Sequence, residues 1–344
     1  MAAENEMIDR YGRPLHERMM NEAPLSTSEP KAPSLISIVV PAYNEGDVIP
    51  EFNRRLSIVR QELLLSSEVI FVNDGSKDNT LELLRGLKAT DPTIGIVDLS
   101  RNFGKEIALT AGLDYARGDV VVIIDADLQH PPELIPKFIA RWREEDADVV
   151  YGQRISRAGE SGVRKLTSRS FYRVISALSG RLIPADAGDF RLLSRRAVDA
   201  LAGVRERHRF MKGLFAWIGY RQVAMPYETD LRFAGVSKWN YWKLWNFSIE
   251  GITSFSIGPL KVATYIGLVT AILSIVYGIF MVIRTILFGN PVPGFPSLLV
   301  AILFLGGLQL IFLGIIGEYL GRTFNEVKQR PLYLVRHWDP SDVR

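Results

Sequence analysis

The most informative segment of this chain is Val121-Val122-Ile123-Ile124-Asp125-Ala126-Asp127-Leu128-Gln129-His130-Pro131-Pro132-Glu133. The four β-branched residues at its start are typical of a strand buried in a parallel sheet. The strand ends in two carboxylates, Asp125 and Asp127, where it enters a loop, and ligands bind at this edge of an open α/β sheet. Such carboxylates can hold a divalent ion that in turn holds a diphosphate. The alternative is that they only cap the helix that begins near Pro132.

Alternating strand and helix patterns surround this stretch. Strands are expected at 36–40, 69–73, 94–99, 120–125 and 149–152. Helices are expected at 47–65, 79–88, 105–117 and 132–145. Regular alternation of this kind predicts an α/β domain with a doubly wound, mainly parallel sheet. We expect this domain to span 34–232, after a polar and mobile tail at 1–33.

Further acidic side chains follow the first two strands. Glu45 lies in Pro41-Ala42-Tyr43-Asn44-Glu45, and Asp74 lies in Val72-Asn73-Asp74-Gly75-Ser76. Both are expected at the same sheet edge as Asp125 and Asp127, which favours a ligand site over a helix cap. Acidic groups near a nucleotide need a cation beside the phosphates, or they bind base and ribose hydroxyls. The chain has no Gly-x-Gly-x-x-Gly and no Gly-Lys-Ser/Thr loop, which argues against dinucleotide-binding and P-loop proteins.

Two more motifs carry charged candidates. Lys105 opens the third helix after Asn102-Phe103-Gly104, where a lysine and a helix N-terminus can meet a phosphate. A solvated lysine at a helix start is the alternative. In Gly188-Asp189-Phe190-Arg191-Leu192, Asp189 is either a base or the ion-pair partner of Arg191, and Asp186 competes for either role.

A strongly basic segment begins after the fifth strand. Its only acid is Glu160, and its apolar positions fall close to helical spacing. Such a segment can hold an anionic lipid head group, or it can be a solvated basic face. Its cations are Arg154, Arg157, Arg164, Lys165, Arg169, Arg173 and Arg181.

Two apolar runs follow near the C-terminus. From Gly251 to Gly317 there is no Asp or Glu, and the only charges are Lys261 and Arg284. The runs at 262–288 and 295–317 are each long enough to cross a bilayer, which takes about 20 residues. We therefore predict two transmembrane helices within 258–318, with a buried hairpin of a soluble protein as the alternative. The aromatic segment at 239–247 predicts an amphipathic stretch, 233–257, on the membrane surface.

The basic residues predict the orientation of this hairpin. The turn between the runs, 289–294, has no basic residue, with only Arg284 near it, whereas the flanks carry Lys238, Lys243, Arg322, Lys328 and Arg330. The positive-inside rule then places the α/β domain and both termini in the cytoplasm, at the inner (plasma) membrane. The tail at 319–344 contains a strand-like Tyr333-Leu334-Val335, which could dock on the same chain or on a neighbour.

Composition excludes several classes of site. With no cysteine, the chain has no disulfide and no thiolate metal site. Its four histidines form no His-x-x-x-His pair, which argues against a zinc site. The net charge is only +3, and we expect no nucleic-acid partner. A homo-oligomer remains open.

The motifs together resemble a known family. Ser37 to Arg191 resembles a family 2 glycosyltransferase with the GT-A fold, on the signatures Pro-Ala-Tyr-Asn-Glu, Asn-Asp-Gly-Ser, Asp-Ala-Asp-Leu-Gln-His-Pro-Pro-Glu and Gly-Asp-Phe-Arg-Leu. The two spans, with Ser237-Lys238 before them and Gln329-Arg330-Pro331-Leu332-Tyr333 after, extend the resemblance over most of the chain. The most similar group is the bacterial polyprenyl-phosphate glycosyltransferases of the GtrB type, which are related to dolichol-phosphate mannose synthase.

The resemblance implies a role for each motif residue. A nucleotide-binding set would hold the donor: Pro41, Ala42, Tyr43, Glu45, Asp74, Lys105 and Asp125. Asp127, with Asp125, would ligate Mg²⁺ or Mn²⁺, Gln129 would approach the donor sugar, and Asp189 would be the candidate base. The lipid phosphate would meet a basic set: Arg154, Arg157, Arg164, Arg169, Arg173, Arg191 and Lys238.

The implied reaction transfers a sugar, with glucose from UDP-glucose the first choice, to polyprenyl (undecaprenyl) phosphate with inversion at the anomeric carbon. The Gln-x-x-Arg-Trp motif of processive polysaccharide synthases is absent, which favours a single transfer. Two alternatives remain: a membrane-bound transferase acting on a hydroxyl acceptor, and a non-catalytic scaffold that binds nucleotide sugar. A flippase is disfavoured, because two spans offer little room for a path.

Overall fold

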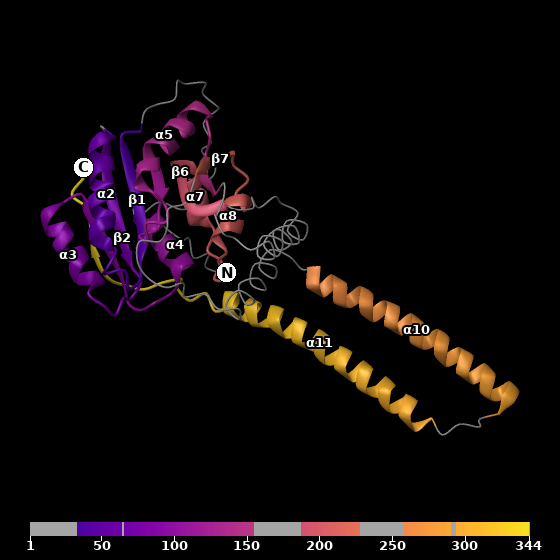
Figure 1. Ribbon diagram of the computed structural model, residues 1–344. Coiled ribbons are helices and arrows are strands. Elements are labelled where there is room, and N and C mark those ends of the chain that lie inside the picture. Colours follow the sequence, from indigo (N-terminus) through magenta and orange to yellow (C-terminus); the bar gives the residue numbers. More distant parts are fainter. Residues whose placement is uncertain (1–32, 64, 155–186, 228–257, 290–293, 344) are drawn as a thin grey trace, which may run out of the picture. The chain divides into compact units, whose positions relative to one another are not determined.

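The computed structural model describes residues 33–63, 65–154, 187–227, 258–289 and 294–343 (Figure 1). The tail at 1–32, the basic residues from Arg157 to Arg173, and the segment 233–257 with Lys238 lie outside these residues, as does the side chain of Arg154.

Among the described residues, the strands form one eight-stranded sheet in the order β7-β5-β6-β4-β1-β2-β3-β8. The strands are β1 Leu35–Ala42, β2 Ser66–Asn73, β3 Ile94–Leu99, β4 Val120–Ile123, β5 Val149–Arg154, β6 Ala187–Ser194, β7 Gln222–Tyr227 and β8 Val335–Asp339. The helical elements are α2 Ile49–Glu62, α3 Thr80–Thr90, α4 Lys105–Tyr115, the short 3₁₀ helix η1 Pro132–Leu134, α5 Ile135–Glu144, α7 Arg195–Gly203, α8 Met211–Trp217, α10 Gly258–Phe288 and α11 Phe295–Val327.

The centre of the sheet is parallel, as the alternating pattern predicts. β1 lies between β2 and β4 and runs parallel to both, with Val39 opposite Ile70 and Ile123. All five predicted strands and all four predicted helices are present. β6 and β8 are the antiparallel members, and the sequence pattern did not predict β6. β6 pairs with β4 and β5, and such long-range pairing leaves no local periodicity to read.

Helices cover both faces of the sheet, which makes it doubly wound. On one face lie α2, α3 and α5: Phe52 of α2 is buried beside Phe71 of β2, and Phe138 of α5 stacks on Phe190 of β6. The Phe52 ring packs edge-on against Phe71 with 6.3 Å between centroids. On the other face, α4, α7 and α8 pack on residues such as Val39. Full burial of one such side chain stabilises the fold by roughly 1.5–3 kcal/mol.

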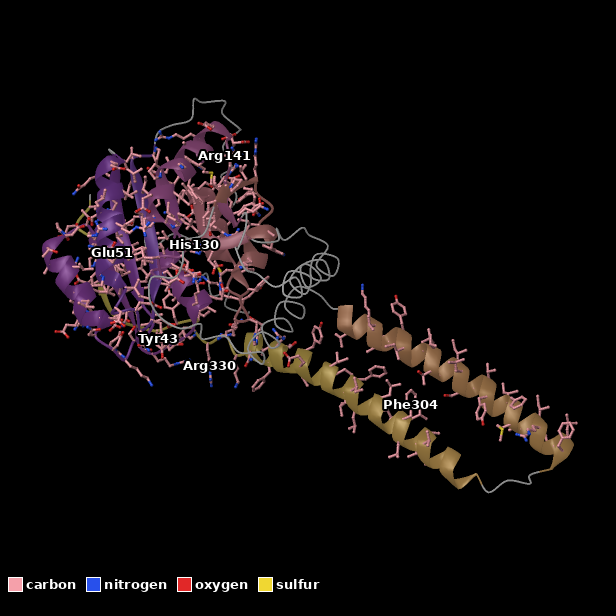
Figure 2. The ribbon with its side chains drawn as sticks, in the orientation of Figure 1. Tyr43, Glu51, His130, Arg141, Phe304 and Arg330 are labelled. Atoms are coloured by element: carbon pink, nitrogen blue, oxygen red, sulfur yellow. The ribbon has the colours of Figure 1, made fainter. Side chains whose placement is uncertain are left out.

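The two C-terminal helices keep their apolar side chains exposed. Windows in α10 and α11 have mean hydropathies of 2.5 and 2.4, and none of either window is buried. Phe288 is 79% exposed and Leu310 is 71% exposed, and Figure 2 shows Phe304 projecting from α11. A soluble protein would bury such a hairpin, so these helices have the length and surface expected for a bilayer.

The C-terminal region differs from the predicted domain boundaries. α11 continues past the predicted end of the span near Gly317 to Val327, so the boundary at 318/319 falls inside a helix. The segment after α11 is not a separate tail, because β8 joins the edge of the sheet antiparallel to β3. The strand is Val335–Asp339, slightly later than the strand-like Tyr333-Leu334-Val335, and it docks on its own chain.

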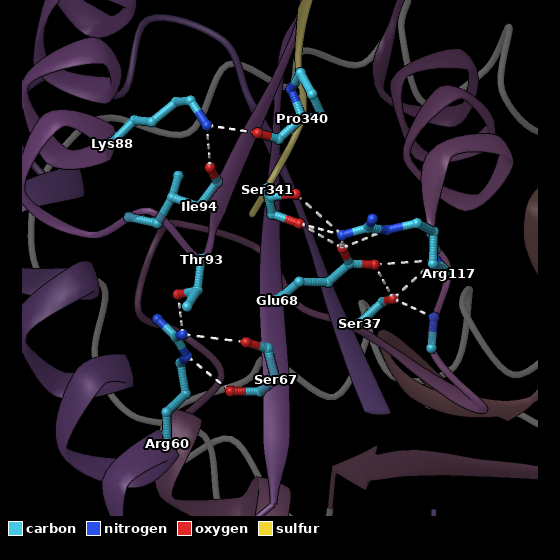
Figure 3. Close-up of polar contacts among 12 residues, drawn as sticks. Ser37, Arg60, Ser67, Glu68, Lys88, Thr93, Ile94, Arg117, Pro340 and Ser341 are labelled. Carbon is cyan, nitrogen blue, oxygen red and sulfur yellow. Dashed lines mark hydrogen bonds and ion pairs between the residues drawn. The ribbon is translucent and has the colours of Figure 1, made fainter. Parts of the chain in front are cut away.

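A buried glutamate fastens this returning segment. Glu68, which is 1% exposed, accepts hydrogen bonds from the hydroxyls of Ser37 (2.6 Å) and Ser341 (2.6 Å) and from the Arg117 guanidinium (2.8 Å), as Figure 3 shows. Lys88 Nζ donates to the carbonyl of Pro340 at 2.6 Å. Burial alone would raise the pKa of Glu68, but the hydrogen bonds outweigh it and hold the pKa below its usual value.

Glu68→Gln should lower the stability of the α/β domain by about 2 kcal/mol at pH 7, since it removes charge-assisted hydrogen bonds from a buried site. Thermal unfolding followed by tryptophan fluorescence measures this, with Glu62→Gln, an exposed change on α2, as the control. A carboxylate whose pKa is lower in the folded than in the unfolded protein stabilises the folded state at pH values above its ordinary pKa of 4.5. This stabilisation is lost as the pH falls through the pKa of the folded state. The difference between wild type and Glu68→Gln should therefore shrink in acid. Equal melting temperatures at pH 7 would contradict it.

Candidate active site

The loops after β1 and β2 are tied together at the carboxyl edge of the sheet. The amide of Asn44 donates to Ser76 Oγ at 3.0 Å, and the amide of Lys77 donates to Asn44 Oδ1 at 2.8 Å. The amide of Glu45 donates to Thr80 Oγ1 at 3.0 Å. Asn44 has φ 54°, a left-handed conformation that asparagine tolerates better than most residues. These bonds hold the predicted Ala42-Tyr43-Asn44-Glu45 motif beside the Asn-Asp-Gly-Ser motif.

Asp74 fastens the loop that precedes α4. It is 3% exposed, and its two carboxylate oxygens accept the amides of Phe103 (2.7 Å) and Gly104 (2.9 Å). Burial outweighs these bonds and raises the pKa of Asp74. Gly75 has φ 65°, and a Cβ there would clash with the backbone of Arg101. The predicted nucleotide-binding Asp74 therefore also positions the loop that carries Lys105.

Lys105 bridges two carboxylates that the sheet brings together. Ile123 of β4 pairs with Arg191 of antiparallel β6. Asp125 lies two residues after Ile123 and Asp189 lies two residues before Arg191, so the two carboxylates meet at the same edge of the sheet. Lys105 Nζ lies 2.7 Å from Asp125 Oδ2 and 2.5 Å from Asp189 Oδ2. Burial would lower the pKa of Lys105, but the two carboxylates outweigh it and raise that pKa.

Asp189 is held in its ionised form. Burial would raise its pKa, yet the charges of Lys105 and Lys212 outweigh that effect and hold the pKa well below its usual range. Asp189 forms its ion pair with Lys105. The sequence had suggested Arg191, two residues away, as the partner. Arg191 is fully buried, with its guanidinium 4.3 Å from the Phe215 ring centroid and its Nε donating to the carbonyl of Gly188. The structure does not bring Arg191, predicted to bind lipid phosphate, to an exposed surface.

The loop after β4 presents its polar residues on one side. Asp125, Asp127 and Gln129 are partly exposed, whereas the residues between them are buried. Leu128, 1% exposed, has φ 58° and anchors this turn, and the amide of Gln129 donates to Asp127 Oδ1 at 3.1 Å. Asp125, Asp127 and Gln129 are therefore together, as the sequence predicted.

Several residues near this edge had no role assigned from sequence. His130 is 2% exposed; its Nδ1 lies 2.7 Å from the Tyr227 hydroxyl and its Nε2 lies 3.7 Å from Asp125 Oδ2. Glu106 accepts the amide of Met211 at 3.3 Å. Burial and then the charge of Asp189 raise the pKa of Glu106 to about 7. The sequence signals were the histidine within Asp-Leu-Gln-His and the acid directly after Lys105.

The carboxylates of Asp125 and Asp127 are suitable ligands for a divalent cation whose coordination shell the substrate would complete. Among the described residues, no group of three or more His, Cys, Asp or Glu side chains forms a metal cage. Mg²⁺ is bound by one or two carboxylates together with substrate phosphates and water, so two carboxylates at an open edge suit such an ion. These oxygens are hard donors and suit Mn²⁺ equally.

Comparison with known proteins agrees with this architecture. The family described as Glycosyl transferase family 2 matches residues 37–202, and the GtrB C-terminal hairpin matches residues 251–323. An uncharacterized glycosyltransferase of Synechocystis sp. is 55% identical over 87% of this chain and 94% of its own. The SfII prophage-derived bactoprenol glucosyl transferase of Shigella flexneri is 47% identical over 88% of this chain and 97% of its own.

Among solved structures, glucosyl-3-phosphoglycerate synthase from Mycobacterium tuberculosis, solved with Mn²⁺, UDP-glucose and phosphoglyceric acid, is 23% identical with a TM-score of 0.42. The match covers 65% of this chain and 79% of that one. The sheet, its carboxylate edge and the sequence relatives define a glycosyltransferase of the GT-A class. The chain belongs to glycosyl transferase family 2, and it carries the GtrB-type hairpin at its C-terminal end.

Asp74→Asn should loosen the loop before α4, because an amide offers one acceptor oxygen where the carboxylate offers two. Hydrogen exchange at the amides of Phe103 and Gly104 should speed up, and stability should fall by about 1–2 kcal/mol. The exposed Asp47→Asn at the same sheet edge is the matched control. Unchanged exchange at both amides would show that Asp74 does not hold this loop.

Proposed function

We propose that the protein transfers glucose from UDP-glucose to the phosphate of a polyprenyl phosphate, with undecaprenyl phosphate as the natural acceptor class. The observation that carries the proposal is the 47% identity to a bactoprenol glucosyl transferase across 97% of that protein. The carboxylates of Asp125 and Asp127 at the sheet edge, together with the exposed apolar hairpin, support it. The product of the proposed reaction would be a lipid-linked glucose, used for modification of the cell envelope.

In the proposed reaction, a phosphate oxygen of the acceptor attacks the anomeric carbon, and UDP leaves from the opposite face. The bond to the UDP oxygen breaks as the new glycosyl–phosphate bond forms, so an α-linked donor gives a β-linked product. A divalent ion held by Asp127 and Asp125 would supply positive charge to the diphosphate. Tyr43 and Glu45, on the loop after β1, would hold the nucleoside, and Gln129 would contact the donor sugar.

The charge state of Asp189 shapes its proposed part in this reaction. A carboxylate with a depressed pKa is a weak proton acceptor, and Lys105 already neutralises it. The acceptor phosphate is largely ionised near pH 7, since its second pKa is about 6, so it needs little help from a base. We therefore assign Asp189 to the positioning of Lys105 beside Asp125, where the ammonium faces the developing charge of the leaving group.

The apolar hairpin would determine where in the cell this reaction takes place. α10 and α11 would anchor the enzyme in the plasma membrane, so that the α/β domain stays in the cytoplasm with the nucleotide sugar. The polyprenyl chain stays in the bilayer, and its phosphate reaches the domain from the membrane surface. The orientation rests on the basic residues that flank the hairpin, such as Arg322 and Lys328.

The direct test is to incubate the purified full-length protein with undecaprenyl phosphate and a panel of nucleotide sugars, and to weigh the lipid products. The expected product is undecaprenyl phosphate carrying one hexose, made from UDP-glucose. Transfer only to a hydroxyl acceptor would replace the proposal with the first alternative. Donor binding with no transfer and no UDP release in lipid extract would favour the scaffold.

Asp127→Asn should abolish transfer while the melting temperature stays close to wild type, because a partly exposed carboxylate is exchanged for an isosteric amide. Loss of one electrostatic stabiliser of the transition state costs about 10²–10³ in kcat. EDTA should have the same effect on the wild-type enzyme, and Mn²⁺ or Mg²⁺ should restore activity to the wild type but not to the variant. Full transfer in EDTA would overturn the metal role.

The hairpin turn should be the part of the chain that reaches the far side of the membrane. Because the chain has no cysteine, Gly294→Cys introduces a single thiol at an exposed position before α11. It should react with an impermeant thiol reagent applied to intact cells. Lys137→Cys, exposed on α5, should react only after lysis. The reverse pattern would overturn the orientation.

A further inference from the structure

The connection between α7 and α8 contacts the end of the membrane hairpin. The amide of Arg207 donates to Glu326 Oε1 at 2.8 Å, and the side-chain amide of Asn325 lies 3.1 Å from His208 Nε2. Asn325 and Glu326 belong to the last turn of α11. This end of the connection is therefore joined to the helix that would emerge from the bilayer.

The other end of the same connection reaches the acidic residue that follows Lys105. Met211, the first residue of α8, donates its amide to Glu106, the neighbour of Lys105. Lys212 follows Met211 directly in α8, so the chain places it next to the residue whose amide bonds Glu106. Its positive charge also contributes, after that of Lys105, to the low pKa of Asp189. Residues 207–212 thus link the end of α11 to the site at which the sugar would be transferred.

Two cations on this link have no ion-pair partner among the described residues. Arg205 pairs with Asp114 at 2.8 Å, and Arg209 is buried and donates to the carbonyl of Val204. No described carboxylate lies within 4.0 Å of the side-chain nitrogens of Arg207 or Lys212, both of which are partly exposed. Their charges remain available for an anion.

The negatively charged phosphate of the acceptor lipid would be repelled by the carboxylates of the site, and the charges of Arg207 and Lys212 would reduce this repulsion. The phosphate carries up to two negative charges and must approach Asp125, Asp189 and Glu106. Lys105 is already paired with Asp125 and Asp189, so an arriving phosphate calls for further positive charge at this edge. Arginine binds phosphate oxygens through a fixed fork, and lysine acts as a point charge.

We propose that Arg207 and Lys212 bind the phosphate of the acceptor lipid, with Arg207 on the membrane side and Lys212 beside the reacting carbon. This inference rests on the proposed function. It adds a phosphate-binding element between α7 and α8 to the basic segment that begins at Arg154, and neither cation was among the residues predicted from sequence.

The test compares Arg207→Gln and Lys212→Met with wild type in full-length enzyme. The kcat/KM for undecaprenyl phosphate should fall at least tenfold in each variant, while the dissociation constant for UDP-glucose stays within twofold. Lys212→Arg should recover most of the loss, since it keeps the charge. Lys137→Met removes an exposed lysine on α5 and is the matched control, with no change in either constant.

A binding readout separates this inference from the proposed function. Farnesyl phosphate and farnesol share one chain and differ by the phosphate, so the ratio of their affinities reports phosphate recognition alone. Wild type should prefer the phosphate, and both variants should lose that preference. If wild type makes no lipid-linked sugar, the proposed function fails and this ratio still decides the inference. An unchanged ratio in both variants, or an equal loss of UDP-glucose affinity, would overturn it.

Discussion

The contact of one ammonium with two carboxylates holds the site together. Lys105 comes from the start of α4, Asp125 from the loop after β4, and Asp189 from β6, so this ion pair joins three elements that are distant along the chain. It depends on antiparallel β6 pairing with β4, which sets Asp189 across from Asp125. Asp74 in turn holds the loop that presents Lys105. Without the cation, two carboxylates would face each other at the edge where the proposed donor diphosphate would bind.

A second constraint comes from the path of the chain around the hairpin. After α11 the chain returns to the α/β domain as β8, and the Tyr115 and Trp338 rings pack with 4.6 Å between centroids. Glu68 then ties Ser341 to the sheet interior. The C-terminal end of the apolar hairpin is therefore attached to the sheet through β8.

Sequence reasoning predicted the parts of the site that follow a local pattern. The strand before Asp125 is a β-branched run, and residues after parallel strands share one sheet edge, so the grouping of Asp74, Asp125 and Asp127 could be foreseen. The burial of Arg191 was not foreseen, and its part in phosphate binding stays a prediction. Its neighbour Asp189 suggested an ion pair or a phosphate site, but its side chain lies under the sheet against Phe215. Successive side chains of β6 point to opposite faces, and both faces are covered, so Arg191 is buried as fully as Phe190 and Leu192.

The alternation of strands and helices, the carboxylate edge and the apolar hairpin can all be inferred from the amino-acid sequence, because each depends on the periodicity or composition of neighbouring residues. The folded chain was needed to see that Lys105 pairs with Asp189, 84 residues away, and that β8 closes the sheet edge. It was also needed to see that residues 207–211 join the end of α11 to Glu106, the neighbour of Lys105. Such contacts join residues far apart in the chain, and their energies depend on burial and register that no single segment encodes.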